Sequence, residues 1–327
     1  MHFLKIGDYE PDEIQYILDL SHELNSSNEP VLNGKNILFT FEKPSLRTKV
    51  GTEAAINHLG GDVIHIDPSS FLGGNVVYAE PVESHKERES LHDTVKNVSQ
   101  WCDAIFARVY SHQTLLNLKQ FASIPVVNAL CDKHHPMQAM ADIYTIQEKY
   151  GTDKKLVITF IGDANNVAYS LGEIALKFGH EYRFAGPEKY SWNREQLNYF
   201  ADLAKMYGGT FTMTHKPKKA LKGCDVFYTD SFVSMGQEKV YEEKMHHFSG
   251  YQITVEAFEH ATEGAGFMHC LPAHRGIEVT DKVMDHPNSW VIDQARNRMV
   301  VSKGIFAHLI KNKENSPIAE NSVSNHG

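Results

Sequence analysis

The sequence predicts an α/β protein built from two doubly wound domains with parallel sheets. Strand-like and helix-like segments alternate along almost the whole chain, a pattern typical of parallel strands covered by helices. The alternation restarts after Gly151, and residues 151–155 have the composition of a hinge. The 327 residues suffice for two domains of ordinary size.

Each predicted element has its own signal. Pro11 opens a helix that places Ile14, Ile17 and Leu18 on one face, and Gly60 ends the helix that begins at Leu46. Short apolar runs bounded by turn residues indicate buried strands. In the first half we expect strands at 35–41, 63–66, 104–109 and 125–130, with helices at 11–24, 46–59, 91–101, 113–121 and 137–150. In the second half we expect strands at 156–161, 182–185, 210–214 and 225–229, with helices at 167–178, 194–206 and 304–311.

Composition disfavours several classes of protein. Hydrophobic residues make up 42% and charged residues 22% of the chain, which is typical of a soluble globular protein. The net charge of −9 argues against nucleic acid as the main partner, because such binders usually present a basic surface. We find no run of about 18 apolar residues, so we expect no membrane span, and no signal-peptide pattern at the N-terminus.

The cysteines show neither the CxxC spacing of a zinc site nor the density of a disulfide framework. They are Cys102, Cys131, Cys224 and Cys270. We therefore expect reduced, mostly buried thiols and a cytoplasmic protein.

Polar residues follow several predicted strands at their carboxyl ends, where ligands bind in open α/β sheets. The 45–48 turn, Ser-Leu-Arg-Thr, ends a strand and opens a helix whose first N–H groups have no helical partner. Ser45 and Thr48 add hydroxyl donors, and Arg47 adds a fork suited to phosphate. The turn predicts an anion site, although a Ser N-cap beside a surface Arg would look the same.

Other basic and polar residues of the chain fit the same edge of a sheet. Arg108 ends a predicted strand, but taken alone it fits a surface ion pair better. His135 and Gln138 can face one ligand across the first turn of a helix, although His135 would also serve as a helix cap. Arg296 and Arg298 precede the last predicted helix and, taken alone, suggest surface charges.

The second half contains three candidate segments. Residues 162–167 stand where a dinucleotide turn would, but they lack its GxGxxG pattern; Asn165 and Asn166 offer amide groups to a polar ligand instead. Asp230, at a strand end, can hold an ammonium group or accept its proton. Cys270 follows an apolar strand and, by residue type alone, is more often structural.

Together these motifs resemble the aspartate/ornithine transcarbamoylase family, and its ornithine branch in particular. The 45–48 turn is similar to the family's S-x-R-T carbamoyl phosphate loop, and 135–138 is similar to its HPxQ segment. Residues 230–236 resemble the D-x-x-x-S-M-G segment, and 269–272 the HCLP segment. Their order and spacing fit over nearly the whole chain.

The resemblance implies transfer of the carbamoyl group of carbamoyl phosphate to the δ-amine of L-ornithine. Direct attack in a ternary complex would give L-citrulline and phosphate. The resemblance also implies two domains joined by two interdomain helices, a homotrimer or a multiple of trimers, and no metal or organic cofactor. The carbamoyl-phosphate-binding domain would span 1–135, completed by a C-terminal helix at about 304–313, and the ornithine-binding domain 136–303. A polar tail at 314–327 would be disordered.

The matching motifs assign roles to individual residues. Carbamoyl phosphate would be bound by Ser45, Leu46, Arg47, Thr48, Arg108, His135, Gln138, Cys270, Leu271 and Arg298. Ornithine would be bound by Asn165, Asn166, Asp230, Ser234 and Met235. The catalytic residues would be Arg108, His135, Asp230 and Cys270.

The chain departs from the family pattern in its first half. Lys49 stands where the family has a second Arg. This replacement keeps the positive charge but loses the guanidinium group that can form two parallel hydrogen bonds. Segment 68–88 is longer than usual and contains no Gln for the neighbouring subunit's phosphate site; Ser84, His85 or Lys86 could take its place.

Three other functions stay open on the sequence. The same chemistry could act on an N-acylated ornithine, a diamine or aspartate, although the Ser-Met-Gly segment favours free ornithine. A non-catalytic homologue could bind carbamoyl phosphate or regulate a partner enzyme. An NAD oxidoreductase would rest on the βαβ alternation alone, and fold does not fix function.

Overall fold

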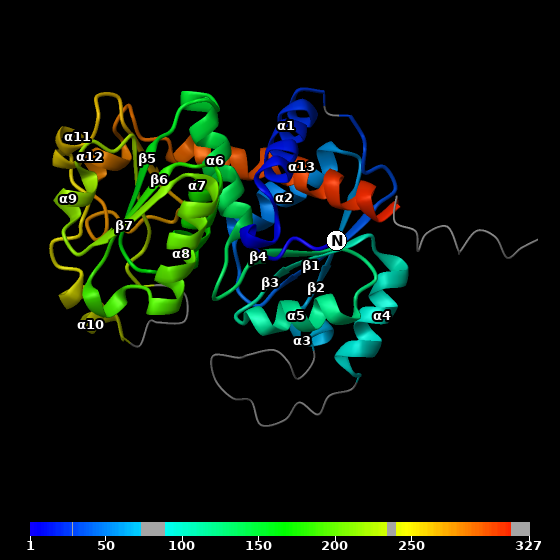
Figure 1. Cartoon of the computed structure of the whole chain (residues 1–327). Helices are drawn as coiled ribbons and strands as arrows, with labels where there is room; N and C mark the ends of the chain where they lie inside the picture. Colours follow the sequence, from blue (N-terminus) through cyan, green and yellow to red (C-terminus); the bar gives the residue numbers. More distant parts are fainter. Residues whose placement is uncertain (28, 73–88, 234–239, 315–327) are drawn as a thin grey trace, which may run out of the picture. The chain divides into compact units, whose positions relative to one another are not determined.

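Parallel strands form two separate sheets in the computed structural model of the chain (Figure 1). The structure describes residues 1–27, 29–72, 89–233 and 240–314. The chain divides into two compact units: unit 1 comprises Met1–Met137 and Arg298–Gly327, and unit 2 comprises Gln138–Asn297. The strands of both sheets pair in parallel, which confirms the predicted fold class.

Unit 1 contains a sheet with the strand order β2-β1-β3-β4. Its strands are β1 (Asn36–Phe41), β2 (Asp62–Ile66), β3 (Ala104–Arg108) and β4 (Val126–Leu130). Its helices are α1 (Pro11–Ser27), α2 (Leu46–His58), α3 (Pro68–Phe71), α4 (Leu91–Trp101) and α5 (His112–Phe121), with a 3-10 turn at Ile6–Asp8. The last helix, α13 (Val291–Glu314), begins in unit 2 and ends in unit 1. Figure 1 shows α4 and α5 on one face of this sheet and α1, α2 and α13 on the other.

Unit 2 contains a sheet with the strand order β7-β6-β5-β8-β9. Its strands are β5 (Val157–Ile161), β6 (Glu181–Ala185), β7 (Thr210–Thr214), β8 (Val226–Thr229) and β9 (Gly266–His269). Its helices are α6 (Pro136–Tyr150), α7 (Asn166–Lys177), α8 (Arg194–Tyr207), α9 (Pro217–Leu221), α10 (Tyr241–His247), α11 (Glu256–His260) and α12 (Asp281–Met284), with a 3-10 turn at Glu188–Tyr190. Helix α6 begins two residues before the unit does, so the chain passes between the units within α6 and α13.

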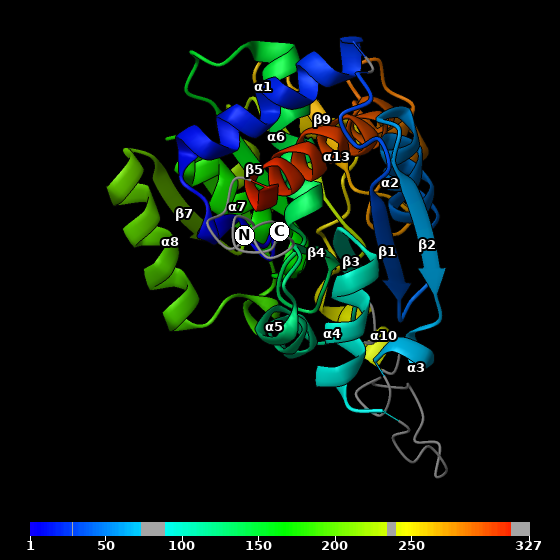
Figure 2. The same ribbon diagram turned by 90° about the vertical axis from the view of Figure 1, so that its right-hand side faces the viewer.

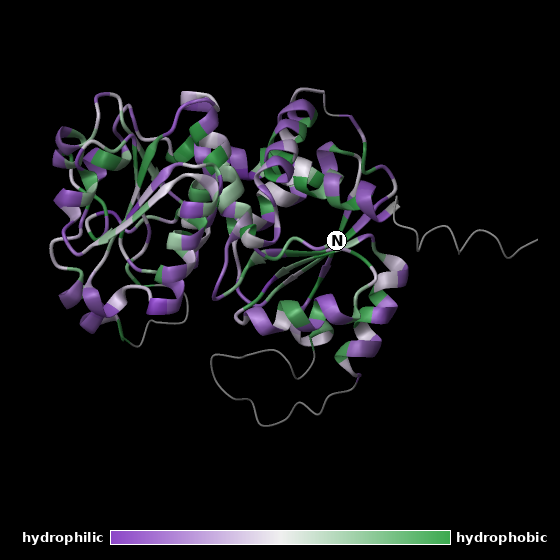
Figure 3. Cartoon of the chain, in the orientation of Figure 1, coloured by the Kyte–Doolittle hydropathy of each residue, from purple (hydrophilic) through white to green (hydrophobic). Residues whose placement is uncertain are grey.

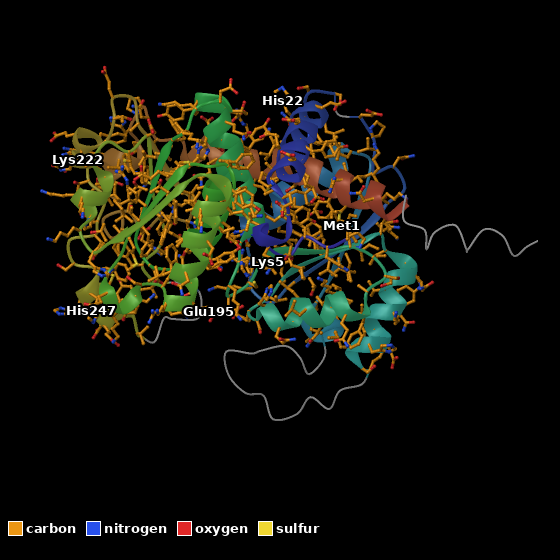
Figure 4. All side chains as sticks on the ribbon, in the orientation of Figure 1. Met1, Lys5, His22, Glu195, Lys222 and His247 are labelled. Carbon is orange, nitrogen blue, oxygen red and sulfur yellow. The ribbon has the colours of Figure 1, made fainter. Side chains whose placement is uncertain are left out.

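Apolar side chains are buried against both faces of each sheet. In unit 2, Leu171 and Phe200 of α7 and α8 pack on one face with Tyr182, whereas Leu221 and Val283 belong to the core on the other face. Central strands are buried on both sides, so their sequences are continuous apolar runs. Figure 3 shows such strands in green, between helices that are more polar. Of the residues labelled in Figure 4, Lys5 is half-buried and the others are exposed.

One predicted element is wrong in its extent. The final helix begins at Val291, whereas we expected it at Gly304, so Arg296 and Arg298 lie inside the helix. Gly304 is not a helix start: a Cβ at this position would lie 2.1 Å from Ser21 Oγ and 2.5 Å from the Ile17 carbonyl oxygen. Glycine is required there because α13 passes close to the backbone of α1.

A helix that crosses a bilayer must be both long and apolar. No helix in 1–27, 29–72, 89–233 and 240–314 meets both requirements.

Candidate functional site

The candidate site of unit 1 is the N-terminus of α2. Strand β1 ends at Phe41, and the chain enters α2 through Ser45, which has extended backbone dihedrals and makes no side-chain capping bond. The hydroxyl of Ser45 and the first N–H groups of α2 are thus not engaged in a cap. The Leu46 side chain is 75% exposed, so it is the backbone of this residue that can contribute to an anion site.

Two arginines converge on the first turn of α2. Thr48, 2% exposed, accepts hydrogen bonds from Arg298 Nη2 at 3.2 Å and from Arg108 Nη1 at 3.5 Å. The register of the sheet places Arg108 beside Phe41, and the N–H of Glu42 donates to the Arg108 carbonyl oxygen. Parallel pairing of β1 and β3 therefore fixes Arg108 next to the helix N-terminus, and the predicted anion residues come together. Arg47 is half-buried in the same turn, and Lys49 is exposed.

His135 is a neutral member of this positively charged group. It is 4% exposed, and its burial, followed by the charges of Arg298 and Arg108, lowers its pKa well below the usual 6.5. A neutral imidazole between two cations donates one N–H bond and adds no further positive charge. It can therefore polarise a carbonyl oxygen without competing with the arginines for an anion.

The candidate site of unit 2 is centred on Asp230. Oδ1 of Asp230 accepts a bond from the Cys270 thiol at 3.1 Å and from the Ser231 N–H at 2.8 Å. Oδ2 accepts a bond from Asn165 Nδ2 at 2.8 Å. The Asn165 Oδ1 atom caps α7 through the N–H groups of Val167 and Ala168, so the amide of Asn165 holds Asp230 in place. Asn166 is half-buried as the first residue of α7.

The turn after β9 has an unusual backbone. Leu271 is the only non-glycine residue of the described chain with a positive φ, +58°, and the Leu271–Pro272 peptide is cis. The Leu271 N–H donates to Nδ1 of His269 at 2.9 Å, and Nε2 of His269 lies 3.2 Å from the fully buried Glu278 carboxylate. The ring therefore carries its proton on Nε2. By accepting the Leu271 N–H, it helps to hold Leu271 at a positive φ, a backbone conformation that residues with a side chain rarely adopt.

Asp230, His269 and Cys270 each place a possible metal-ligand atom within 4.8 Å of the others, and no other such group occurs among the described residues. Both ring nitrogens of His269 already bond within the protein, to the Leu271 N–H and to Glu278. We therefore interpret this group as one that shares protons rather than as a metal site.

A buried ion pair supports the Asp230 loop, and sequence reasoning missed it. Lys244 of α10 is 1% exposed; its Nζ lies 2.5 Å from Asp163 Oδ2 and donates to the Phe232 carbonyl oxygen at 3.0 Å. Asp163 lies two residues before Asn165, and Phe232 two residues after Asp230. The only signal was the position of Asp163 after a buried strand, because Lys244 sits among charged residues that look like a solvated helix face.

Several predicted residues cannot be placed. Ser234 and Met235, assigned to ornithine, lie outside the described residues, as do Ser84, His85 and Lys86 of the long loop.

Gln138 lies at the start of α6 and is 1% exposed, and its Nε2 donates to Asp142 Oδ1 at 2.8 Å.

The α/β fold, the anion site of unit 1 and the carboxylate–thiol pair of unit 2 define the class of protein as a group transferase. The chain matches two family models: residues 1–148 the "Aspartate/ornithine carbamoyltransferase, carbamoyl-P binding domain", and residues 154–309 the "Aspartate/ornithine carbamoyltransferase, Asp/Orn binding domain". The chain belongs to the aspartate/ornithine carbamoyltransferase family.

Relatives cover nearly the whole chain. It is 40% identical over 312 residues to the ornithine carbamoyltransferase of Pyrococcus abyssi, which spans 94% of this chain and 95% of that one. It is 40% identical over 310 residues to the enzyme of the same name from Caldicellulosiruptor saccharolyticus, spanning 93% and 97%. The solved structure of ornithine carbamoyltransferase from Pyrococcus furiosus superposes with a TM-score of 0.86 at 38% identity, covering 95% of this chain and 97% of that one.

Proposed function

We propose that this protein transfers the carbamoyl group of carbamoyl phosphate to the δ-amine of L-ornithine, giving L-citrulline and phosphate. The observation that carries the proposal is the convergence of Arg108 and Arg298 on Thr48 at the N-terminus of α2. Two arginines at a helix N-terminus provide both the charge and the directed donors that a phosphate group requires. The family's ornithine-named relatives at 40% identity support the acceptor.

The residues that we assign to carbamoyl phosphate are those that match the family's motifs. Its phosphate would bind the 45–48 turn with Arg108 and Arg298, and its carbonyl oxygen would face Arg108 and His135. The residues assigned to it are Ser45, Leu46, Arg47, Thr48, Arg108, His135, Gln138, Cys270, Leu271 and Arg298. The carbamoyl NH2 would donate to the side-chain oxygen of Gln138 and the backbone oxygens of Cys270 and Leu271.

The proposed acceptor site is built around Asp230. The residues assigned to ornithine are Asn165, Asn166, Asp230, Ser234 and Met235, with Asn165 acting through its bond to Asp230. The δ-ammonium of ornithine has a pKa near that of lysine, about 10.4, so it must lose a proton before it attacks. Asp230, with the Cys270 thiol at 3.1 Å, is placed to hold the ammonium and accept or share that proton.

The chemical step is a direct transfer. The amine nitrogen forms a bond to the carbamoyl carbon, and the tetrahedral oxyanion is stabilised by Arg47, Arg108 and neutral His135. The bond from carbon to the phosphate oxygen then breaks, and the amine gives up its second proton as phosphate leaves. Positioning and electrostatics supply the rate, so Cys270 need not form a covalent bond with the carbamoyl group.

The assembly that we propose is a homotrimer or a multiple of trimers, in the cytoplasm. Strand β2 is an outer strand of its sheet (Figure 2), and all of its residues are exposed or half-buried, although parallel strands are usually covered. Leu46 and Val50, one helical turn apart on α2, are 75% and 55% exposed, and Ile64 of β2 is 43% exposed. Such apolar exposure beside an open sheet edge supports an interface with another copy of the chain. Light scattering coupled to gel filtration tests it, because a monomeric mass at micromolar concentration contradicts the proposal.

The experiment that tests the proposed reaction is a citrulline assay with purified protein, carbamoyl phosphate and a panel of acceptors. Ornithine, N-acetylornithine, putrescine and aspartate distinguish the acceptor classes. We expect carbamoylation of ornithine to exceed that of every other acceptor. Tight binding of carbamoyl phosphate without any carbamoylated product would instead indicate a non-catalytic binding protein.

A further inference from the structure

Side-chain contacts join the carboxyl ends of β5 and β8 in unit 2. The two strands are neighbours, with Ile161 beside Thr229, and the Thr229 hydroxyl donates to the Ile161 carbonyl oxygen at 2.6 Å. Beyond the strand ends, Asn165 Nδ2 donates to Asp230 Oδ2 at 2.8 Å. A further contact between the two segments runs through Lys244 of α10.

Lys244 closes a ring of contacts that contains the Asp230 carboxylate. Its Nζ lies 2.5 Å from Asp163 Oδ2, two residues before Asn165. The same Nζ donates to the Phe232 carbonyl oxygen at 3.0 Å, two residues after Asp230. Because Asn165 in turn donates to Asp230, the ring returns to its starting point. One ammonium group therefore fixes the spacing between the two segments that hold the Asp230 carboxylate.

The ammonium group of Lys244 is enclosed by protein. Lys244 is 1% exposed and Asp163 is 7% exposed. Nζ lies 4.9 Å from the centroid of the Tyr190 ring and 6.0 Å from that of Phe248, and Phe232 stacks on Phe248. A buried ion pair is often no more stabilising than apolar side chains of the same volume, because both charges lose their hydration. Stability alone is therefore a weak explanation for Lys244, whereas directed bonds in a site of low dielectric define a single geometry.

We propose that Lys244 is a positioning residue for the acceptor amine. The inference rests on the proposed function, in which Asp230 holds the ammonium group of ornithine and accepts or shares its proton. Lys244 acts on the Asp230 carboxylate through Phe232 on one side and through the segment of Asp163 and Asn165 on the other. A displacement of about 1 Å in a positioned group can reduce the rate by about 10²-fold.

The sign of the effect separates positioning from electrostatics. Lys244→Met removes a positive charge from the surroundings of Asp230. If the charge alone mattered, the ammonium group of ornithine would be repelled less, and the KM of ornithine would fall. If the position of Asp230 matters, the KM of ornithine rises although the repulsion is lost.

Two variants and one control test the proposal. Lys244→Met keeps most of the volume and removes the ammonium group. The double variant Asp163→Asn/Lys244→Met loses one negative and one positive charge, so it keeps the net charge of the wild type but lacks the directed bonds of the ammonium group. Lys303→Met is the matched control, because Lys303 of unit 1 is also 1% exposed and donates to Asn25 Oδ1 at 3.2 Å.

The kinetic measurements are the KM of ornithine and the inhibition constant of inorganic phosphate, both on the full-length enzyme. In both Lys244 variants we expect the KM of ornithine to rise by about tenfold or more, the loss typical of broken hydrogen bonds to a charged group. The inhibition constant of inorganic phosphate should stay within about twofold, since we assign phosphate to the α2 turn of unit 1. Lys303→Met should leave both values unchanged.

The Cys270 thiol reports the same geometry without turnover. It is half-buried and donates to Asp230 Oδ1, whereas the other three cysteines are buried. In both Lys244 variants we expect iodoacetamide to alkylate Cys270 severalfold faster than in the wild type, because a thiol held less firmly against the carboxylate is more open to the reagent. Mass spectrometry of the peptide that contains Cys270 measures the rate, and Lys303→Met should not change it.

The outcomes separate the two proposals. Wild-type protein that forms no citrulline overturns the proposed function, and the alkylation rates then still decide whether Lys244 positions Asp230 against Cys270. If the wild type turns over, an unchanged or lowered KM of ornithine in folded Lys244→Met overturns the positioning role alone. A parallel rise of the KM of ornithine and the inhibition constant of phosphate overturns it as well, because it would show a general loss of the fold. If Lys244→Met fails to fold, the charge-neutral double variant decides by the same criteria.

Discussion

The Cys270 thiol donates to Oδ1 of Asp230 across 3.1 Å, although the two residues are 40 positions apart in the chain. The carboxyl ends of β8 and β9 bring them together, because these strands are neighbours in the sheet. In the proposed reaction, the ammonium group of the acceptor would replace this thiol as a donor to Asp230. We therefore regard Asp230 as the primary group for the acceptor amine and Cys270 as its modulator.

Replacing Asp230 should remove most of the activity. Asp230→Asn is isosteric but can neither attract the ammonium group nor take its proton, so we expect kcat to fall by about 10²- to 10⁴-fold. Cys270→Ser should lose less, because a hydroxyl still donates to Asp230. Steady-state citrulline assays measure both, and Cys102→Ala, a buried thiol in unit 1, is the control. Near-normal turnover by Asp230→Asn would show that Asp230 takes no part in the reaction.

Arg47 tests the anion site. Arg47→Ala removes a half-buried cation from the first turn of α2, and we expect kcat/KM for carbamoyl phosphate to fall by several orders of magnitude, roughly 10³-fold. The exposed Arg194 at the start of α8 provides the control, since Arg194→Ala makes the same change of charge far along the chain. Equal activity of the two variants would show that the α2 turn does not bind the substrate phosphate.

Buried histidines should make the fold sensitive to acid. Burial, followed by the charge of Lys155, lowers the pKa of His180 from 6.5 to about 4. Below pH 6.5 the unfolded chain therefore takes up a proton that the folded chain does not, and the free energy of unfolding falls as pH decreases toward 4. Above pH 6.5 both states are neutral at this residue and it contributes no pH dependence.

His180→Gln should flatten that dependence. Thermal unfolding at a series of pH values from 4 to 8 measures it, with the exposed His22→Gln as control. The melting temperature of His180→Gln should fall less between pH 6.5 and 4 than that of the wild type. If the melting temperatures of the two proteins fell equally with decreasing pH, this would contradict a neutral His180 in the folded protein.

Two glycines inside helices should respond in opposite ways to alanine. Gly304→Ala puts a methyl group 2.1 Å from Ser21 Oγ and 2.5 Å from the Ile17 carbonyl oxygen, so we expect a loss of about 1–3 kcal/mol or more. Gly51, within α2, has nothing within 4 Å of an added Cβ, and Gly51→Ala should add about 0.5–1 kcal/mol. Urea unfolding compares the two. Stabilisation by Gly304→Ala would show that α13 does not pass so close to α1.

The sequence was sufficient to predict the parallel sheets and the strand ends that hold the site. Continuous apolar runs mark buried parallel strands, and the 45–48 turn, Arg108 and Asp230 directly follow such runs. The end of the chain was less predictable, because Gly304 looks like a helix boundary. Only the contact with Ile17 and Ser21, far away in the sequence, explains a glycine inside α13.

The supporting contacts could not be predicted for a similar physical reason. Gln294 Nε2 donates to Asp142 Oδ1 across 152 positions of the chain, and Lys244 pairs with Asp163 across 81. Neither pair has a local pattern, since a glutamine or a lysine on a helix normally indicates an exposed face. Their burial follows from the packing of elements that sequence periodicity does not specify.

The most direct test of the central claim is the rate of citrulline formation from carbamoyl phosphate and L-ornithine by the purified wild-type protein. The account predicts saturable turnover at about 1–10³ per second, reduced by about 10²-fold or more in Arg47→Ala and Asp230→Asn, with N-acetylornithine, putrescine and aspartate as poor acceptors. Absence of citrulline, or faster carbamoylation of another acceptor in the panel, would contradict it.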